Sequence, residues 1–502
     1  MEGMNWKLKG CHTSRKLLSP CSVDVDRLSS LPDELLSRIL SMLPTKDVAA
    51  LQVLSKRICT HAFSWITSVD LDDSPISHSP DCPHLVERFP LFVLFVDHVI
   101  NKLSLFGQPL SRFRLHVGVD HTSHWENPYE SYSNFPHLDP PRLNTWISFP
   151  LAHLGLRELD LCFNVSNPSA HQLPPGLFVC TSLEVFKLDS NLKLDGAQIP
   201  LISLPKLKIL HLHSLFIVED GFITRLVSSC LSLEDLTLTS CWWGQSDCLS
   251  ISSLSLERLE LHIPKCDEMK NGDLVLINTP NLKYFYYDDN LAYCYSVTNM
   301  NALVQATVVL GYPLRDGSDE NVLHVQLGLV RMLSNAKHLS LLGGFVENMH
   351  YGGEFKDQLP MFHNLKTLEL SWNKPFARWD EILLETLLCS PNLEALAFPQ
   401  GLFDSIVEEI NDFEDLDLFT ETTPQCFLTN LKRIVIKYYM GIAQELNIIK
   451  FFLKKASNLQ ELAVEFLPQQ RFGVPLHDRM LSLERTLKNL PRASINCLIR
   501  VS

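Results

Sequence analysis

The sequence lacks the marks of membrane, secreted and metal-binding proteins. Its longest apolar run, residues 91–96, is far shorter than the roughly 20 residues that span a bilayer. Residues 1–22 include basic side chains, but the apolar block of a signal peptide does not follow them. The 14 cysteines contain no Cys-x-x-Cys pair, which favours reduced cysteines over disulfides or a zinc site. We therefore expect an intracellular protein, in the nucleus or the cytoplasm.

Positive charge is also scarce. The chain has 43 Lys and Arg against 57 Asp and Glu, a formal net charge of −14 at pH 7. Nucleic acids and anionic membranes are bound through basic surfaces, so we expect neither as a partner. A hydrophobic content of 46% excludes a mostly disordered chain. A length of 502 residues predicts several domains or a repeat array.

Short catalytic motifs are missing as well. The sequence has no Gly-x-Ser-x-Gly, no phosphate-binding loop, no His-Glu-x-x-His and no dinucleotide fingerprint. His116, His121 and His124 lie close together, but without a matching second pair they fit surface histidines better than a metal site. We expect no catalytic residue, no metal and no cofactor. An enzyme would need a nucleophile and a base clustered in residues 116–150 or among the residues on the concave face of the strands.

One pattern recurs along most of the chain: an aliphatic residue, a second apolar residue three positions later and a third after two more. Six successive copies begin at Leu156, Leu183, Leu207, Leu233, Leu256 and Leu282. The steps between them are 27, 24, 26, 23 and 26 residues, within the range of leucine-rich repeats. The last two apolar residues of each copy are two apart, so they face the same side of a strand.

These repeats predict an α/β solenoid with parallel strands on its concave face and helices outside. Residues 220–230 and 379–389 have helical periodicity and supply part of the outer layer. Residues 116–150 show little periodicity and are interpreted as a loop. Residues 401–424 contain eight acidic side chains and no basic one, which fits a solvated insertion better than a docking site for a basic partner.

Residues that alternate with the buried leucines should line the open side of the strands. They form a mixed polar and aromatic surface suited to a protein partner. The candidate target-binding residues are Asp160, Lys187, His211, His213, Arg258, Glu260, Tyr284, Tyr286 and Glu369. Trp242 and Trp243 follow a repeat strand, and we expect them to pack against the neighbouring repeat.

The N-terminal region predicts three short helices. Pro32 suits the first position of a helix, Pro44 ends that helix, and Thr45 can begin the second. Ile58, Phe63 and Trp65 indicate the third helix, and Asp70 and Asp72 are interpreted as its exit. Three helices in about 45 residues are too small for a core that is usually stable alone, so we expect a second chain to cover them.

Two stretches of this region resemble the F-box of plant F-box proteins. They are Leu31-Pro32-Asp33-Glu34-Leu35-Leu36 with Ile39-Leu40, and Val53-Leu54-Ser55-Lys56-Arg57. In that family the helices dock on a Skp-type adaptor, which links them to cullin and RING subunits of a ubiquitin ligase. The adaptor contacts implied by this resemblance are Leu31, Pro32, Leu35, Leu36, Ile39, Leu40, Leu43, Val48, Leu51 and Leu54. The family continues with Trp where this chain has Ile58, which implies a weaker adaptor contact.

The C-terminal region is similar to the FBD module of the same plant proteins. It has a strand at 431–436, a helix at about 444–455 and the ending Pro491-Arg492-Ala493-Ser494. The resulting domains are a tail (1–22), the F-box (24–75), a helical lead-in (76–109), leucine-rich repeats (110–423) and the FBD module (424–502). The FBD module can cap the last repeat, whose edge would otherwise be open.

The resemblance implies a non-catalytic substrate-recognition subunit of a Skp–cullin–F-box ubiquitin ligase. Its F-box would bind the adaptor, and its repeats would bind an unidentified target protein. The alternative is a repeat-based binding scaffold that is not coupled to a ligase.

Overall fold

A computed structural model gives the fold of the chain. It describes residues 30–53, 56–73, 85–107, 109–117, 139–153, 155–165, 167–169, 171–219, 221–243, 248–263, 274–289, 294–298, 300–311, 327–346, 358–371, 379–402, 423–466 and 476–502. The chain divides into two compact units, residues 1–66 (unit 1) and residues 67–502 (unit 2).

Unit 1 contains the three predicted helices: α1 (Asp33–Leu40), α2 (Thr45–Leu51) and α3 (Lys56–Trp65). Helix α1 begins directly after Pro32 and has acidic side chains in its first turn, as the helix dipole favours. The core of the unit is small. Its fully or almost fully buried residues are Leu36, Leu40, Val48, Ile58, Ala62, Phe63 and Ile66.

Unit 2 is built on one parallel sheet of 15 strands, which follow one another in chain order. Its strands are β1 (Ser68–Asp72), β2 (Arg112–Val117), β3 (Glu158–Phe163), β4 (Val185–Asp189), β6 (Ile209–His213), β8 (Asp235–Thr239), β11 (Arg258–His262), β13 (Tyr284–Asp289), β15 (Gln305–Leu310), β16 (His338–Gly343), β17 (Thr367–Leu370), β18 (Ala395–Phe398), β19 (Arg433–Tyr439), β20 (Glu461–Phe466) and β21 (Leu498–Val501). Each neighbouring pair of these strands is parallel, which confirms the arrangement that the repeats predict.

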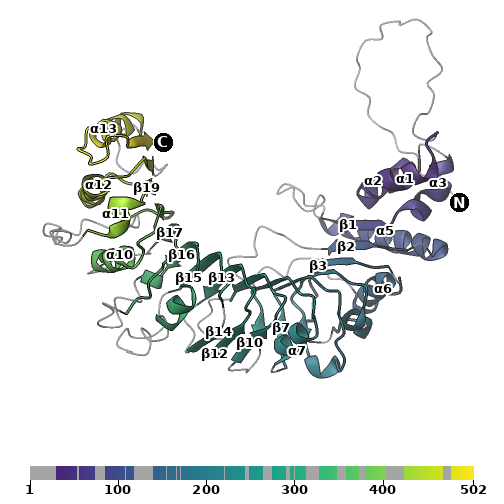
Figure 1. Ribbon diagram of the computed structural model, residues 1–502. Helices are drawn as coiled ribbons and strands as arrows, with labels where there is room; N and C mark the ends of the chain where they lie inside the picture. Colours follow the sequence, from purple (N-terminus) through teal and green to yellow (C-terminus); the bar gives the residue numbers. More distant parts are fainter. Residues whose placement is uncertain are drawn as a thin grey trace, which may run out of the picture. The chain divides into compact units, whose positions relative to one another are not determined.

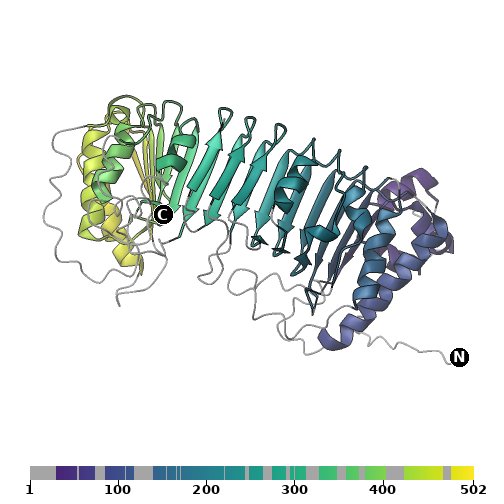
Figure 2. The ribbon, with the colours of Figure 1, turned by 90° about the horizontal axis from the view of Figure 1, so that it is seen from below.

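A second layer connects these strands on one side of the sheet (Figures 1 and 2). It includes the helices α5 (Leu85–Phe106), α6 (Pro140–Leu151), α7 (Phe222–Ser228), α10 (Trp379–Leu388), α11 (Gln425–Thr429), α12 (Ala443–Lys455) and α13 (Leu476–Lys488), with the 3-10 turns η2 (Pro175–Val179) and η3 (Gly196–Gln198). Two small parallel sheets belong to the same layer: β5 (Lys193–Leu194), β7 (Phe216–Ile217) and β9 (Trp242–Trp243), and β10 (Cys248–Ser252), β12 (Leu274–Asn278) and β14 (Cys294–Thr298).

The core lies between the two layers. The last two apolar residues of each repeat are buried there, and none of the following is more than 2% exposed: Leu159, Leu161, Phe186, Leu188, Leu210, Leu212, Leu236, Leu238, Leu259, Leu261, Phe285 and Tyr287. Burial of one such leucine contributes about 1.5–3 kcal/mol. Trp242 is buried in this layer and stacks on Phe216, as the sequence predicts.

Polar contacts between neighbouring repeats help to set the register. Buried Asn191 accepts a hydrogen bond from the backbone N–H of Val165 and donates one to its carbonyl, both at 2.9 Å. At the start of the strands, Glu394 accepts from Lys366 and Lys432. These two ammonium groups lower the pKa of Glu394 to about 2.

Helix α6 corrects one prediction. Residues 116–150 were interpreted as a loop, whereas 140–151 form a helix. Two prolines occupy its first positions, where the missing N–H costs nothing, and Leu143, Trp146 and Ile147 form its buried side. The Trp146 indole donates a hydrogen bond to Asp97 of α5 at 2.7 Å.

Helix α5 contains the only described stretch that is long and apolar enough to cross a membrane by length and composition, residues 89–106. Its apolar character has a structural explanation, because one side of the helix is buried in unit 2. Phe92, Val93, Val96, Val99, Ile100 and Leu103 lie on that side.

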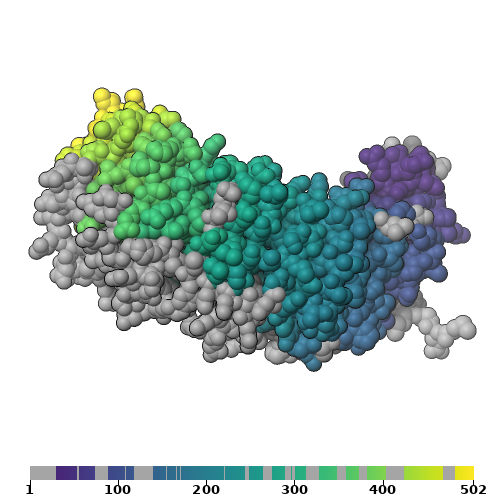
Figure 3. Space-filling view, turned by 60° about the horizontal axis from the view of Figure 1, so that its bottom comes forward, coloured from purple at the N-terminus to yellow at the C-terminus, as the bar shows by residue number. Residues whose placement is uncertain are grey.

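The unit boundaries differ from the predicted domains in two places. Strand β1 belongs to the long sheet and pairs with β2, although Asp70 and Asp72 were interpreted as the exit of the F-box. Strands β19 to β21 continue the same sheet, so the predicted FBD module adds the final strands to the repeat array. Helix α12 at 443–455 confirms the predicted helix in this region. In the space-filling view the described parts of unit 2 follow one another in chain order (Figure 3).

Candidate functional site

Unit 1 carries an apolar surface. Met42 is 76% exposed, Val53 is 88% exposed and Leu35 is 45% exposed, a high exposure for side chains of this kind in so small a unit. Pro32 is also exposed, and Leu31, Ile39, Leu43 and Leu51 are half-buried. Large exposed apolar side chains are candidates for contact with a partner.

Three predicted adaptor contacts are buried and do not belong to this surface. Leu36, Leu40 and Val48 have no exposed surface, so they form the core of unit 1 and cannot touch a partner in this conformation. The apolar stripe of α1 is wide enough to serve two environments: one side of it packs on α3, and the other faces solvent. Leu54 lies outside the described residues.

Contacts between α1 and α3 hold this surface in place. The guanidinium of Arg57 donates a hydrogen bond to the carbonyl of Leu31 at 3.0 Å and pairs with Asp33. The Ser37 hydroxyl donates to the carbonyl of Trp65. Ile58, which stands where the family has Trp, is 1% exposed, so this departure lies in the core of the unit.

The second candidate site is the open face of the long sheet, formed by the side chains that alternate with the buried leucines. The strand register arranges them in rows that cross the strands. One continuous row contains Asp160, Lys187, His211, Thr237, Glu260, Tyr286, Thr307, Ser340 and Glu369. Thus six of the nine predicted target-binding residues share one row.

The other three lie in the flanking rows. Arg258 and Tyr284 occupy paired positions on β11 and β13, and His213 is on β6. Glu369 is separated from the next predicted residue, Tyr286, by three strand spacings, or about 14 Å. Its carboxylate accepts a hydrogen bond from Ser340 at 2.8 Å.

Aromatic and charged groups are in direct contact at the centre of this face. The guanidinium of Arg258 lies 4.0 Å from the ring centroid of Tyr284, and the rings of His262 and Tyr286 stack at 4.4 Å. Arg258 also pairs with Glu260. The imidazole of His262 and the guanidinium of Arg258 lower the pKa of Glu260. Such Arg and Tyr clusters are typical of the residues that carry most of the energy in protein interfaces.

Next to this centre, His211 lies 3.3 Å from Asp235 and 6.5 Å, between ring centroids, from His213. Asp235 is also within 3.9 Å of Arg258. Burial and the charge of Asp288 raise the pKa of Tyr286 to about 12, so its hydroxyl stays protonated at neutral pH. We call the side chains of Asp235, Arg258, Glu260, His262, Tyr284 and Tyr286 the central cluster.

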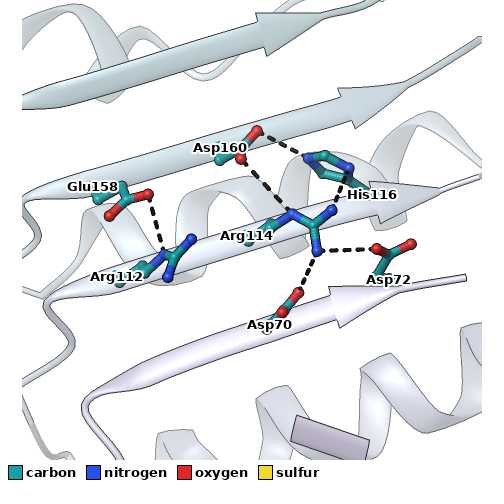
Figure 4. A network of polar contacts seen from close by, with 7 residues as sticks. All are labelled: Asp70, Asp72, Arg112, Arg114, His116, Glu158 and Asp160. Carbon is teal, nitrogen blue, oxygen red and sulfur yellow. Dashed lines mark hydrogen bonds and ion pairs between the residues drawn. The ribbon is translucent and has the colours of Figure 1, made fainter. Parts of the chain in front are cut away.

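A further ionic network, absent from the sequence prediction, lies on β1 to β3 (Figure 4). Arg114 reaches Asp70 and Asp72, both at 2.9 Å, and Asp160 at 3.8 Å. His116 bridges this group, with its ring nitrogens 3.1 Å from Arg114 and 2.9 Å from Asp160.

The network is half-buried and electrostatically satisfied. Burial would raise the pKa of Asp160, but the hydrogen bond from His116 and the neighbouring cations lower it below the ordinary value. Burial would lower the pKa of the Arg114 guanidinium, but the carboxylates of Asp70, Asp72 and Asp160 raise it above the ordinary value. His116 is therefore part of an ionic network and is not the isolated surface histidine that the sequence indicated. His121 and His124 lie outside the described residues.

The described residues include many possible metal ligands and several cysteines. Among these residues, no group of three or more His, Cys, Asp or Glu side chains is arranged to hold a metal ion. Burial raises the pKa of the thiols of Cys230, Cys241 and Cys426 to about 12, which keeps them protonated and unreactive.

Comparisons with known proteins match three regions of the chain to family models. Residues 28–64 match the F-box domain, residues 143–312 match the LRR repeats of the FBD-associated F-box protein At5g56370, and residues 421–464 match FBD.

Curated relatives from Arabidopsis thaliana match over most of the chain. F-box/LRR-repeat protein At4g14103 is 33% identical over 77% of this chain and 94% of its own length. F-box/LRR-repeat protein At3g59210 is 29% identical over 96% of this chain and 95% of its own length. FBD-associated F-box protein At5g22730 is 26% identical over 95% of this chain and 94% of its own length.

Proposed function

Because the chain belongs to the F-box/LRR-repeat family with a C-terminal FBD region, we propose that it is the substrate-recognition subunit of a Skp–cullin–F-box ubiquitin ligase. Unit 1 binds a Skp-type adaptor, and through it the cullin and RING subunits. The open face of unit 2 binds a target protein inside the cell. The subunit makes and breaks no covalent bond itself. It raises the local concentration of target lysines near a ubiquitin-charged partner.

The apolar surface of unit 1 is the observation that carries this proposal. Leu35, Met42 and Val53 remain exposed after the three helices have packed. Exposed aliphatic side chains gain about 25 cal/mol per Å² when a partner covers them, so an adaptor that buries this surface gains affinity directly. The division between exposed and buried leucines also tells which substitutions test binding and which test folding.

Direct binding of a purified Skp-type adaptor to the full chain tests the proposal. We expect Leu35→Ala with Met42→Ala to weaken binding at least tenfold, because the two truncations remove contact area and leave the core of unit 1 intact. The matched control is Leu91→Ala with Leu105→Ala on α5. These leucines are 65% and 79% exposed but belong to unit 2. Adaptor binding that is absent in the unaltered chain, or equally weakened by both pairs, contradicts the proposal.

A further inference from the structure

The charge on the open face is unevenly distributed along the sheet. The open-face positions of the strands from β1 to β13 carry eight carboxylates and four Lys or Arg side chains. Their net charge is −4 when the histidines are neutral. The carboxylates are Asp70, Asp72, Glu158, Asp160, Asp189, Asp235, Glu260 and Asp288, and the cations are Arg112, Arg114, Lys187 and Arg258. We call this part of the open face the acidic stretch.

Each cation of the acidic stretch lies beside a carboxylate. Arg112 pairs with Glu158 at 3.1 Å, and Arg114 and Arg258 are held by the carboxylates described above. Lys187 is the register neighbour of Asp160 and lowers the pKa of that carboxyl group. The positive charges are therefore engaged within the sheet, and the excess charge that faces a partner is negative.

The next part of the same face differs. From β15 to β18 the alternate positions carry one carboxylate, Glu369, and no Lys or Arg. They are mostly small or uncharged residues, such as Thr307, Ser340, Ala395 and Ala397. These four strands therefore contribute little to the selection of a partner by charge.

The central cluster adds aromatic groups to this negative field. The rings of Tyr284 and Tyr286 are half-buried, so part of each ring stays accessible on the open face. Arg258 already lies over the ring of Tyr284, which shows that the cluster accommodates a guanidinium on an aromatic surface. A Lys or Arg side chain from a partner can lay its aliphatic part on these rings and place its charge near Asp235 or Glu260.

We propose that the acidic stretch of the open face binds a basic, extended segment of the target protein, with Lys or Arg side chains placed on the central cluster. This inference rests on the proposed function, because it specifies the chemistry of the target that the repeat surface takes. A segment of opposite charge gains affinity from the field of the whole stretch and associates faster than a neutral one.

Anisotropy measurements with three labelled twelve-residue peptides test the inference: alternating Lys and Ser, alternating Gln and Ser, and alternating Glu and Ser. All chains carry Asn or Gln at the eight acidic positions of residues 401–424, so that this segment does not attract the basic peptide. We expect the Lys peptide to bind at least tenfold tighter than the other two, with an affinity that falls as salt is added.

Variants then localise the binding. Asp235→Asn with Glu260→Gln is expected to weaken binding of the Lys peptide at least fivefold. Asp235→Lys with Glu260→Lys brings the net charge of the acidic stretch from −4 to 0 and is expected to abolish the preference for the Lys peptide. The matched control is Glu461→Gln on β20, which also removes a carboxylate paired with arginines on this face. It lies seven strands from β11, or about 34 Å. It should change the affinity less than twofold.

Equal binding of the three peptides, an equal loss in the control, or an unchanged preference for the Lys peptide in the lysine variant overturns the inference. Adaptor binding, measured on the same chains, separates this outcome from a failure of the proposed function. A chain that binds the adaptor but has no preference for the Lys peptide refutes only the inference. A chain with the predicted peptide preference that does not bind the adaptor refutes the proposed ligase function.

Discussion

Glu445 offers a quantitative test of how the last repeats are held together. Its side chain is completely buried at the start of α12, and one carboxylate oxygen accepts hydrogen bonds from the backbone N–H groups of Met440, Gly441 and Ile442 at 3.0, 2.8 and 3.3 Å. Glu445→Ala would leave three donors, all on half-buried residues, without this acceptor. An unsatisfied buried donor costs about 1–3 kcal/mol, and partial relaxation brings the total to about 3–5 kcal/mol.

Hydrogen exchange of the backbone amides in α12 and α13 measures this loss locally, which suits a repeat protein whose ends can open separately. Each 1.4 kcal/mol is about tenfold, so Glu445→Ala should accelerate exchange roughly a hundredfold to several thousandfold. Glu445→Gln keeps an acceptor oxygen and should lose about 1–2 kcal/mol. Gln444→Ala is the control and should leave exchange unchanged. If exchange in Glu445→Ala stays within threefold of the unaltered chain, the carboxylate does not hold this turn.

Three further predictions concern stability. Leu36→Ala should destabilise unit 1 by about 2–5 kcal/mol, whereas exposed Leu35→Ala should leave its helices unchanged, as followed by hydrogen exchange of α1 and α3. His171 is 2% exposed, and burial lowers its pKa below the ordinary value of 6.5. As the pH drops below about 6.5, the unfolded chain therefore binds a proton at this histidine that the folded chain does not, and the free energy of unfolding falls. Denaturation at several pH values should show a smaller loss of stability at acid pH in His171→Leu, and an identical pH dependence in both chains would contradict this. Gly343 has φ +67°, and a Cβ at this position would collide with the carbonyl oxygen of Leu310. Gly343→Ala should therefore lower the free energy of unfolding, measured by thermal denaturation, by at least about 1–2 kcal/mol. Gly328→Ala is the control and should lower it less, because a Cβ there meets no atom within 4 Å.

The repeat strands and the row of open-face residues could be predicted because one spacing determines both. Once Leu210 and Leu212 face the core, His211 must face the other way, and the same alternation places Glu260 and Tyr286. Parallel stacking in register then brings these residues into one row. The helices at 222–228 and 379–388 were also predicted correctly from their periodicity.

Other features depend on contacts that no short stretch of sequence specifies. Strand β1 has only two buried residues, Val69 and Leu71, and lacks the longer repeat pattern. The ionic partners Arg114 and Asp70 are 44 residues apart and meet only because β1 pairs with β2. In unit 1, the apolar stripe of α1 does not distinguish leucines that face α3 from those that face solvent. The predicted set of adaptor contacts therefore contains both buried and exposed residues.

In the proposed function, two separate surfaces of one chain bind two different partners. Quantitative mass spectrometry of proteins co-purified with the full chain from cells tests it most directly, using Leu35→Ala with Met42→Ala and Tyr284→Ala with Tyr286→Ala. We expect the first pair to lose the Skp-type adaptor and cullin but to keep a second set of proteins, and the second pair to lose that set and keep the adaptor. If both pairs lose the same proteins, or if the unaltered chain captures no Skp-type adaptor, the chain does not bind two partners through two separate surfaces.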